Sequence, residues 1–397
     1  MKNNMKIMAV NAGSSSLKFQ LLEMPSEKLI LTGIIERIGL SDSVFSFKYS
    51  GKKGKEVLNI PNHTVAVELL LKKIVETKVI SSLEEIIGVG HRVVHGAELF
   101  QDSVLIDDEV IKKIESVSDL APLHNPANLT GIFAFRKALP NIKAVAVFDT
   151  AFHQTMEQTE FMYSVPYEWY AKYGVRKYGF HGTSHKYVSL KAAEMLGKKV
   201  EDTKVIVCHI GNGASLCAVN GGKSVDTSMG FTPLSGIAMG TRSGDIDPAI
   251  VQYISQKENK TLDQVIDDLN KKSGYLGLSG LSSDSRDLWE AVKKGDKRSI
   301  LAVEKQAKMI ADYIGAYYLV LDGCDAICFT AGIGENAVET RALVVEKIKA
   351  LGVKLDHDAN ESKGEEMVIS AKDSKITVLL IPTNEEVMIA RDTLRLI

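Results

Sequence analysis

The 397-residue sequence contains only four cysteines, Cys208, Cys217, Cys324 and Cys328. No two of them have the two-residue gap of a zinc knuckle or a thioredoxin-like site, so the spacing predicts neither a zinc site nor a redox dithiol. All four stand in apolar runs, which predicts small buried side chains. A chain of this length also buries enough apolar surface to fold without disulfides.

Long apolar runs and a surplus of one charge are lacking as well. No stretch reaches the roughly 18 apolar residues of a membrane span, and the apolar run in MKNNMKIMAV is too short for a signal peptide. We therefore expect a cytoplasmic protein with no membrane partner. The 48 basic and 50 acidic side chains give a formal net charge of −2, which argues against a nucleic-acid partner because such proteins need a basic surplus.

Apolar runs alternate with amphipathic stretches along the chain, which is typical of an α/β protein of two or three domains. We expect strands at 6–10, 143–149 and 204–210, and helices at 65–76 and 299–321. A weak internal repeat adds to this. The segments KIMAVNAGSSSLKFQLLE and KVIVCHIGNGASLCAVNGG both predict a strand, a glycine-rich turn and a second strand, about half the chain apart. The repeat predicts two similar domains, although two unrelated hairpins would give the same pattern.

The two glycine-rich turns are candidates for phosphate binding, because backbone N–H groups in such turns converge on one point. Ser14, Ser15 and Ser16 add hydroxyl groups to the first turn, and Lys18 adds a cation. A plain hairpin is the alternative. A Walker A loop is excluded, since Cys217 stands where the first glycine would have to precede Gly222-Lys223-Ser224.

A dinucleotide-binding fingerprint is present in FTAGIGENA, where Gly332, Gly334 and Ala337 follow an apolar run over 325–330. Asp356 ends a short predicted strand, GVKLD, about 20 residues later. This keeps an NAD-dependent dehydrogenase open as an alternative. The position near the end of the chain argues against it, since the hairpin turns would then have no role.

Two histidine pairs, His91 with His95 and His181 with His185, have the four-residue spacing of zinc ligands on one helix face. Glycines next to each pair argue against such a helix. Imidazoles that donate hydrogen bonds to an anion and ordinary structural histidines both remain open.

Arginines and carboxylates in turn-like segments are further candidates for the site. Arg92 and Arg242 are suited to bidentate binding of a carboxylate or phosphate, or else form surface salt bridges. Asp149 ends a predicted strand, where open α/β sheets bind ligands, or it caps a helix. The last predicted helix begins at Asn384, Glu385 and Glu386. These side chains either only start the helix or also bind magnesium.

Ten segments together carry a resemblance that none of them carries alone. They are VNAGSSSLKF, GHRVVHG, APLHNPANL, VFDTAFH, YGFHGTSH, HIGNGASL, DTSMGFTPL, MGTRSGDIDP, FTAGIGEN and IPTNEE, in this order over residues 10–386. The chain resembles the acetate kinase family, in the superfamily of sugar kinases, heat-shock chaperones and actin. The resemblance implies two duplicated actin-like (ribonuclease H-like) α/β domains with an interdomain active-site cleft. The implied N-terminal domain is 1–150 plus the helix 385–397, and the implied nucleotide-binding domain is 151–384.

The implied activity is a reversible, magnesium-dependent, direct in-line transfer of the ATP γ-phosphoryl group to acetate, which gives acetyl phosphate and ADP. Mn²⁺ is an alternative metal, and the implied assembly is a homodimer. A propionate or other short-chain acyl kinase stays open, because one methylene is worth only about 1–3 kcal/mol of discrimination. Val94 favours the smaller acid by narrowing the pocket. A non-catalytic nucleotide-binding module of the actin type is the remaining alternative.

The resemblance also implies site residues. Those around the transferring phosphoryl group are Arg92, Asp149, His181 and Arg242. Those of the first phosphate turn are Ser14, Ser16 and Lys18. The nucleotide would contact His209, Ile210, Gly211, Asn212, Gly213, Asp284, Ser285, Arg286, Gly332, Ile333, Gly334, Glu335 and Asn336. The acid would contact Arg92, Val94, Leu123, His124, Phe180 and Pro233. Magnesium would be organised by Asn11 and Glu385.

Three positions depart from the family pattern. Ser285 stands where an aromatic residue is expected, Ser235 where Glu is expected, and Ala97 where Gly is expected. Only the packing of the base at Ser285 is put in doubt. Asp149 is expected to orient magnesium or an arginine, because an ionised acetate has no proton for a base to remove.

Overall fold

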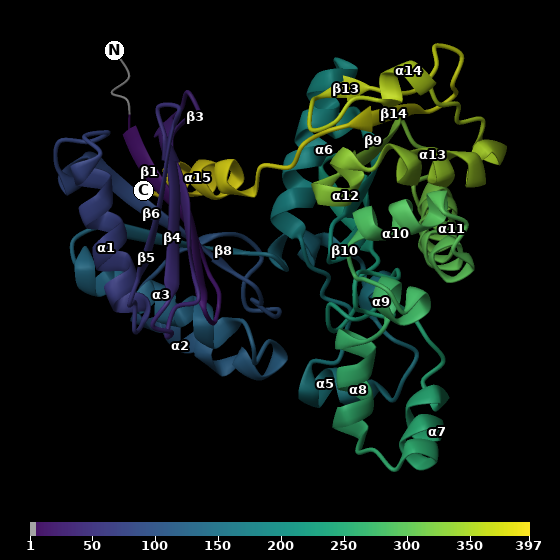
Figure 1. Cartoon of the computed structure of the whole chain (residues 1–397), viewed down its shortest axis with the longest axis horizontal. Helices are drawn as coiled ribbons and strands as arrows, with labels where there is room; N and C mark the ends of the chain where they lie inside the picture. The colour runs from purple at the N-terminus through teal and green to yellow at the C-terminus, as the bar shows by residue number, and fades with distance from the viewer. Residues whose placement is uncertain (1–4) are drawn as a thin grey trace. The chain divides into compact units, whose positions relative to one another are not determined.

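The computed structural model describes residues 5–397, so the first four residues of the segment considered as a signal lie outside it. The chain divides into two compact units, one ending at Phe152 and including Asn384–Ile397, the other His153–Thr383. Each unit has its own mixed β-sheet with helices (Figure 1), which confirms the predicted α/β class. Over residues 5–397 no helix combines the length and the apolar character that a membrane span requires.

The first unit is built on an eight-stranded sheet with the order β5-β4-β3-β2-β1-β6-β8-β7. Strands β1 to β5 form an antiparallel meander, whereas β6 and β8 run parallel to β1. The carboxyl ends of β1, β6 and β8 therefore meet at one edge. The strands are β1 (Met5–Ala12), β2 (Ser16–Met24), β3 (Lys28–Glu36), β4 (Ser43–Tyr49), β5 (Lys52–Leu58), β6 (Ile86–Val93), β7 (Val104–Leu105) and β8 (Lys143–Phe148).

Helices cover the two faces of this sheet. Val89 belongs to the core that α1 (His63–Glu76) and α3 (Asn125–Ala138) share with the sheet. Its neighbours Gly88 and Gly90 point the other way, against Thr393 and Ile389 of α15 (Glu385–Leu396). The fourth helix, α2 (Asp108–Ser116), packs on α3. The last helix of the chain is thus part of the first unit's core.

The second unit has a six-stranded sheet with the order β11-β10-β9-β12-β14-β13. Strands β9, β10 and β11 are antiparallel, and β12 and β14 run parallel to β9. The order β11-β10-β9-β12-β14 repeats β3-β2-β1-β6-β8 of the first unit, which confirms the internal repeat. The strands are β9 (Lys204–Ile210), β10 (Ala214–Asn220), β11 (Lys223–Thr227), β12 (Ala326–Thr330), β13 (Met367–Val368) and β14 (Thr377–Leu380).

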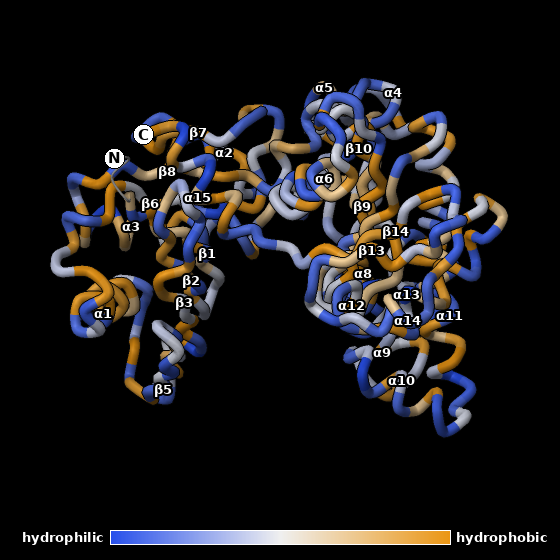
Figure 2. The backbone as a smooth tube through the Cα atoms, turned by 90° about the horizontal axis from the view of Figure 1, so that it is seen from above, coloured by the Kyte–Doolittle hydropathy of each residue, from blue (hydrophilic) through white to orange (hydrophobic). Residues whose placement is uncertain are grey.

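Two long helices pack on this second sheet, α6 (Gly182–Leu196) on one side and α11 (Lys297–Val320) on the other (Figure 1). The central strands are hydrophobic and the outer loops hydrophilic (Figure 2). The other helices of the unit are α4 (Gln158–Phe161), α5 (Tyr167–Tyr173), α7 (Ala249–Glu258), α8 (Leu262–Lys271), α9 (Gly274–Ser279), α10 (Ser285–Lys293), α12 (Ala331–Asn336), α13 (Val338–Lys347) and α14 (His357–Asn360).

The expected strands at 6–10, 143–149 and 204–210 and the expected helices at 65–76 and 299–321 are confirmed, within a few residues at their ends. Two expectations are wrong. The segment GVKLD forms only an isolated bridge from Leu355 to Ser370. Cys324 is half-buried, unlike the other three cysteines, because it follows the turn that ends α11.

Gly90 tests the packing of α15. A Cβ atom there would lie 2.3 Å from Thr393 Oγ1 and 2.4 Å from Ile389 Cγ2. We expect Gly90→Ala to destabilise the first unit by about 1–3 kcal/mol through overpacking, measured as a lower midpoint in calorimetric unfolding. Gly315→Ala is the matched control, because nothing beyond its own helix lies within 4 Å of the new methyl. Equal midpoints for the two variants would contradict this packing.

Candidate functional site

Polar residues gather at the edge where β1, β6 and β8 of the first unit end. Asn11 lies near the end of β1, Arg92 near the end of β6, and Asp149 follows β8 directly. The register pairs Val10 with His91 on neighbouring strands. Side chains alternate along a strand, so Asn11 and Arg92 face the side covered by α15. Carboxyl ends of parallel strands are the usual ligand site of α/β sheets.

Arg92 and Asp149 form a two-pronged ion pair. The Nε and Nη2 atoms of Arg92 donate to the two carboxylate oxygens of Asp149 at 2.9 and 2.5 Å. Asp149 is only 2% exposed. Burial lowers the pKa of Arg92, but the charge and hydrogen bonds of Asp149 outweigh it and raise that pKa overall. The carboxylate thereby fixes both the charge and the plane of the guanidinium.

Further carboxylates stand at the start of α15. Burial raises the pKa of Glu385, and the negative charges of Asp149 and Glu386 raise it further. The positive charges of Arg92 and Lys18 lower it, but by less. Lys18 itself is paired with Glu386. Three carboxylates thus share two cations, a surplus that suits a divalent cation. Among residues 5–397 no group of three or more His, Cys, Asp or Glu side chains is arranged as a complete metal site.

The turn that is expected to bind phosphate connects β1 to β2. The amide of Gly13 donates to the Ser16 carbonyl at 2.9 Å, which closes the turn. Ser14 is exposed and Ser16 is half-buried at the start of β2. Lys18 lies opposite Asn11 across the hairpin. The turn and the carboxylate group at α15 are therefore neighbours within the first unit.

The loop after β6 is braced by two buried asparagines that sequence reasoning missed. Asn128 accepts a hydrogen bond from the Val94 amide at 3.0 Å and donates one to the Ala12 carbonyl at 2.8 Å. Asn125 bonds both backbone groups of His95, at 3.1 and 2.9 Å. The available signal was the pair of polar residues in APLHNPANL. Val94 is thereby held in place and buried.

Other predicted residues of this unit have different settings. Leu123 is 75% exposed, ahead of α3, and His124 is exposed at the start of that helix. His91 is buried, and burial lowers its pKa to about 3. Its ring packs edge-on against Phe135 in the core. The helix interpretation of the His91 and His95 pair is wrong, because His91 lies on strand β6. Burial disfavours the charged form of the His91 ring.

The second unit holds a histidine cluster at the ends of β9 and α6. The rings of His181 and His209 stack with centroids 4.2 Å apart. Ser215 Oγ lies 2.9 Å from His181 Nδ1 and 2.8 Å from His185 Nε2, and Ser184 Oγ lies 2.8 Å from His209 Nδ1. His181 has a left-handed backbone with φ of 56°. Such strain in a residue other than glycine is maintained only where neighbours fix the backbone.

Arg242 lies beside this cluster, in a loop as predicted. A Cβ atom on Gly213 would come within 3.4 Å of Arg242 Nη1 and 3.7 Å of the His181 ring, so the three residues meet. Burial lowers the pKa of Arg242. In residues 5–397 the guanidinium of Arg242 donates hydrogen bonds only to the Pro233 carbonyl and to Met239 Sδ, and to no carboxylate. The surface salt-bridge alternative is therefore wrong for Arg242, and an anion would complete its surroundings.

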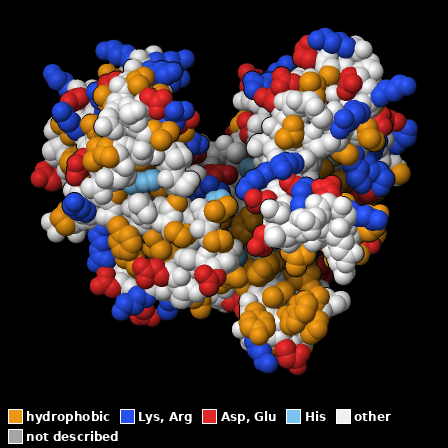
Figure 3. All heavy atoms as spheres, turned by 60° about the horizontal axis from the view of Figure 1, so that its bottom comes forward, with side chains coloured by type: hydrophobic (Ala, Val, Ile, Leu, Met, Phe, Trp, Pro, Cys, Tyr) orange, Lys and Arg blue, Asp and Glu red, His pale blue; other side chains and the backbone are white. Residues whose placement is uncertain are grey.

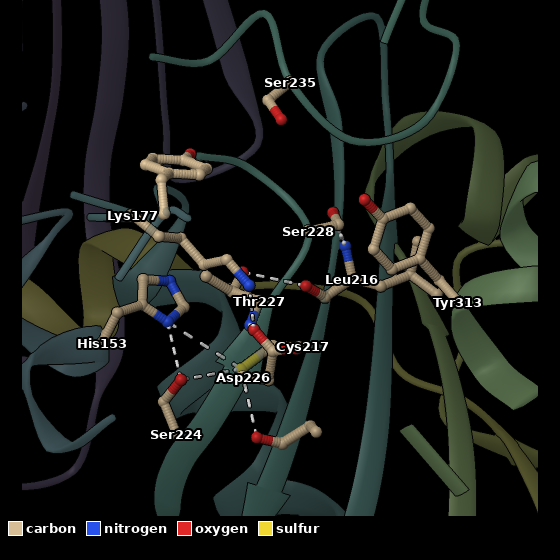
Figure 4. Close-up of polar contacts among 12 residues, drawn as sticks. His153, Lys177, Leu216, Cys217, Ser224, Asp226, Thr227, Ser228, Ser235 and Tyr313 are labelled. Atoms are coloured by element: carbon tan, nitrogen blue, oxygen red, sulfur yellow. Dashed lines mark hydrogen bonds and ion pairs between the residues drawn. The ribbon is translucent and has the colours of Figure 1, made fainter. Parts of the chain in front are cut away.

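His153, in the motif VFDTAFH, holds the backbone next to His181 and was missed by sequence reasoning. Its Nε2 atom lies 2.9 Å from the Phe180 carbonyl, and its Nδ1 atom 2.8 Å from Ser224 Oγ. Cys217 completes this buried group, with Sγ 3.2 Å from Ser224 Oγ (Figure 4). Since a carbonyl only accepts, Nε2 carries the hydrogen.

The Arg242 loop is closed by Asp245. Its Oδ1 atom accepts hydrogen bonds from Ser235 Oγ at 2.7 Å and from the Gly236 amide at 2.8 Å. Its Oδ2 atom accepts one from Tyr313 on α11 at 2.5 Å. Ser235, where the family pattern has Glu, is thus a hydrogen-bond donor to a carboxylate. Figure 4 shows Ser235 and Tyr313 on their separate segments.

A pocket of about 890 Å³ lies in the second unit where α10 and α12 face the turn after β9. It brings together most residues expected to hold a nucleotide: Gly211, Asn212, Asp284, Ser285, Arg286, Gly332, Ile333 and Asn336. Asp284 caps α10, and the hydrogen bonds from Arg286 lower its pKa to about 2. Trp289 also lines the pocket and was missed. Its signal was its place one helical turn after Ser285.

The remaining expected nucleotide residues, His209, Ile210, Gly213, Gly334 and Glu335, do not line this pocket.

Residues outside the pocket hold helix α12 in place. The carboxylate of Glu335 accepts a hydrogen bond from the Thr383 amide at 3.0 Å. Arg341, fully buried, donates to the Gly334 carbonyl at 2.9 Å and to Asn360 at 2.8 Å. Asp356 caps α14 by accepting from the Ala359 amide. The acidic residue required by the dinucleotide alternative therefore has a local structural role.

Comparison with known proteins shows the family of the chain. The model of the acetokinase family matches residues 6–391. The acetate kinase of Bacillus velezensis is 60% identical over 391 residues, 98% of this chain and 99% of the relative. The crystal structure of the Porphyromonas gingivalis acetate kinase superposes with a TM-score of 0.95 at 46% identity, over 98% and 99% of the two chains. The crystal structure of a propionate kinase from Francisella tularensis superposes with a TM-score of 0.93 at 43% identity, over 99% of this chain and 100% of that one. The chain belongs to the acetokinase family.

Proposed function

We propose that this member of the family transfers the γ-phosphoryl group of ATP reversibly to acetate and releases acetyl phosphate and ADP. The observation that carries the proposal is Arg242, a half-buried guanidinium beside His181 with no carboxylate partner among residues 5–397. A transferring phosphoryl group is the anion that such a cation suits. The names of the relatives support acetate as the acceptor.

The chemistry explains why cations are needed. An anionic acceptor approaches an anionic donor, and their repulsion grows in surroundings with a lower effective dielectric than water. Phosphoryl transfer otherwise needs in-line alignment and neutralisation of negative charge spread over three oxygens. We assign this neutralisation to Arg92, Arg242 and His181.

Asp149 acts through Arg92 in this scheme. Acetate is ionised near neutral pH, so no proton has to be removed from it. The carboxylate of Asp149 instead holds both donors of Arg92 in one plane. We infer that it is a positioning residue, and that a base has no step to perform.

Magnesium is the proposed metal, with Mn²⁺ as an alternative. The surplus of carboxylates around Glu385 supports a divalent cation, and Asn11 offers an amide oxygen at the same edge. We propose that Asn11 and Glu385 organise the ion, together with water and the ATP phosphates. Bound there, it would neutralise charge on the donor.

We assign contacts with the acid to five residues: Val94, Phe180, Leu123, His124 and Pro233. Val94 and Phe180 are almost fully buried, at 6% and 2% exposed, so neither yields easily to a larger acid. This supports acetate over propionate. The similarity to a propionate kinase keeps that acid as the second candidate.

We propose the nucleotide-binding domain at 151–384, and the actin-like N-terminal domain at 1–150 with 385–397. The pocket beside α10 and α12 would take the adenosine of ATP or ADP. Ser14, Ser16 and Lys18 would take phosphate oxygens.

A homodimer in the cytoplasm is the proposed state of the protein. Hydrophobic side chains gather at the end of the second unit that carries α7 and α8 (Figure 3). Exposed apolar residues on these helices and on α5 support an interface between copies. They are Tyr167, Trp169, Tyr173, Ile250, Tyr253, Leu262 and Ile266.

The first test of the activity uses ATP, Mg²⁺ and acetate, propionate or butyrate, with hydroxylamine to trap the acyl phosphate. We expect hydroxamate to form, with the highest kcat/KM for acetate. An additional methylene should lower kcat/KM by roughly 10-fold or more. The absence of hydroxamate with all three acids would exclude an acyl kinase.

The role of Asp149 is tested by Asp149→Asn, which keeps the shape of the side chain but removes its charge. We expect kcat to fall by about 100-fold, because a charge-assisted pair to Arg92 is lost. The pH profile should keep its shape. Asp373→Asn, at an exposed ion pair with Lys354, is the control and should leave kcat unchanged. Recovery of the Asp149→Asn activity at high pH would instead point to a base.

The bracing by His153 is tested with two variants. His153→Phe leaves the Phe180 carbonyl without its donor, so we expect a fall in kcat of about tenfold. His153→Gln keeps a donor at similar reach and should restore most of it. Binding of ADP, measured by calorimetry, should stay the same in both variants because neither His153 nor its partners Phe180 and Ser224 line the nucleotide pocket. Equal kcat in both variants and the unchanged protein would rule out a positioning role.

A further inference from the structure

The nucleotide pocket contains one aromatic side chain among its lining residues, Trp289. The position expected to hold an aromatic residue is Ser285, in the first turn of α10, whose short side chain is buried. Trp289 follows by four residues, and residues four apart lie on the same face of a helix. An aromatic surface is thus present on the same helix face, one turn further along.

The indole of Trp289 is fixed by its surroundings. Its Nε1 atom donates a hydrogen bond to Thr340 Oγ1 on α13 at 3.0 Å. Thr340 is itself buried. The indole packs, together with Ile333 of α12, against the core around Leu288. Its position is therefore set before a ligand arrives, which lowers the entropy cost of binding.

Trp289 and Ile333 line the pocket from two different helices, α10 and α12. The remaining lining is mostly polar, including Asn212, Asp284 and Asn336. A flat ring system with polar edges fits such a lining, because its faces need apolar contact and its edges need hydrogen-bond partners.

We propose that Trp289 is the surface against which the nucleobase packs, and that it gives the enzyme its preference for purine over pyrimidine nucleotides. The proposal rests on the proposed ATP-dependent function and goes further by naming the residue that selects the base. A purine presents a larger face to the indole than a pyrimidine, and base–aromatic contacts gain from that area. Ser285 then has no part in base packing.

Fluorescence tests the contact directly, since the chain has only two tryptophans, Trp169 and Trp289. In Trp169→Phe, Trp289 is the sole indole. We expect ADP to change its emission and inorganic triphosphate to leave it unchanged. In the matched variant Trp289→Phe, where Trp169 on α5 is the sole indole, ADP should change nothing. Emission in Trp169→Phe that responds equally to ADP and triphosphate, or to neither, would overturn the proposal.

Kinetics test the selection of the base. Trp289→Leu keeps an apolar side chain packed against the core but removes the aromatic face. We expect the KM for ATP to rise roughly tenfold or more, with kcat and the KM for acetate unchanged. The ratio of kcat/KM for ATP to that for CTP should fall. Because Trp289→Phe keeps an aromatic ring, its KM for ATP and its ratio of kcat/KM for ATP to that for CTP should stay close to those of the unmodified protein.

Failure of this inference differs from failure of the proposed function. An unchanged KM for ATP and an unchanged ATP to CTP ratio in Trp289→Leu would overturn the role of Trp289, while the unmodified protein still makes acyl phosphate. No acyl phosphate from the unmodified protein would overturn the function itself. Binding of ADP to Trp169→Phe would still report on the contact in that case.

Discussion

A half-buried positive charge without a counter-charge is the constraint on which the proposed chemistry depends. Arg242 has lost part of its hydration, which lowers its pKa, and it gains no carboxylate partner among residues 5–397 in return. Such a side chain would turn away if its loop were free, because desolvating an unpaired ion is costly. The loop is not free. Asp245 closes it, and a Cβ on Gly274 would lie 2.0 Å from the Met239 carbonyl, so only glycine fits beneath it.

Arg92, unlike Arg242, has a carboxylate partner that compensates for its partial burial. It is held by Asp149 in a two-pronged pair, and the net effect on its pKa is upward. A paired guanidinium is a weaker electrostatic attractant than an unpaired one, but its plane is fixed. The two arginines thus differ in what each offers an anion: Arg92 offers a fixed geometry and Arg242 an unbalanced charge.

Sequence reasoning located the parts of the site that depend on local order. Asp149 follows a strand, and Arg242 lies in a glycine-rich loop, because short-range patterns decide both. It missed His153, Asn128 and Trp289, whose partners Phe180, Ala12 and Thr340 are between 27 and 116 residues away. Local patterns mark Asn128 and Trp289 as candidates, but they do not identify partners so far along the chain. Ala97 is an intermediate case, since its φ of 48° explains why glycine is the expected residue there.

The repeated sheet explains why one kind of edge supports two kinds of binding. In the first unit β1 runs parallel to β6, and in the second unit β9 runs parallel to β12, so the carboxyl ends of each pair lie together. Val10 lies beside His91 in the first unit, and His209 lies beside Thr330 in the second. In the first unit the edge carries Arg92, Asp149 and the carboxylates of α15, and therefore charge. In the second unit β12 leads into the α12 turn, which presents backbone groups and Ile333. The repeated strand order thus places an edge of the same kind in each unit, and the segments that follow the strands decide which chemical groups stand at that edge.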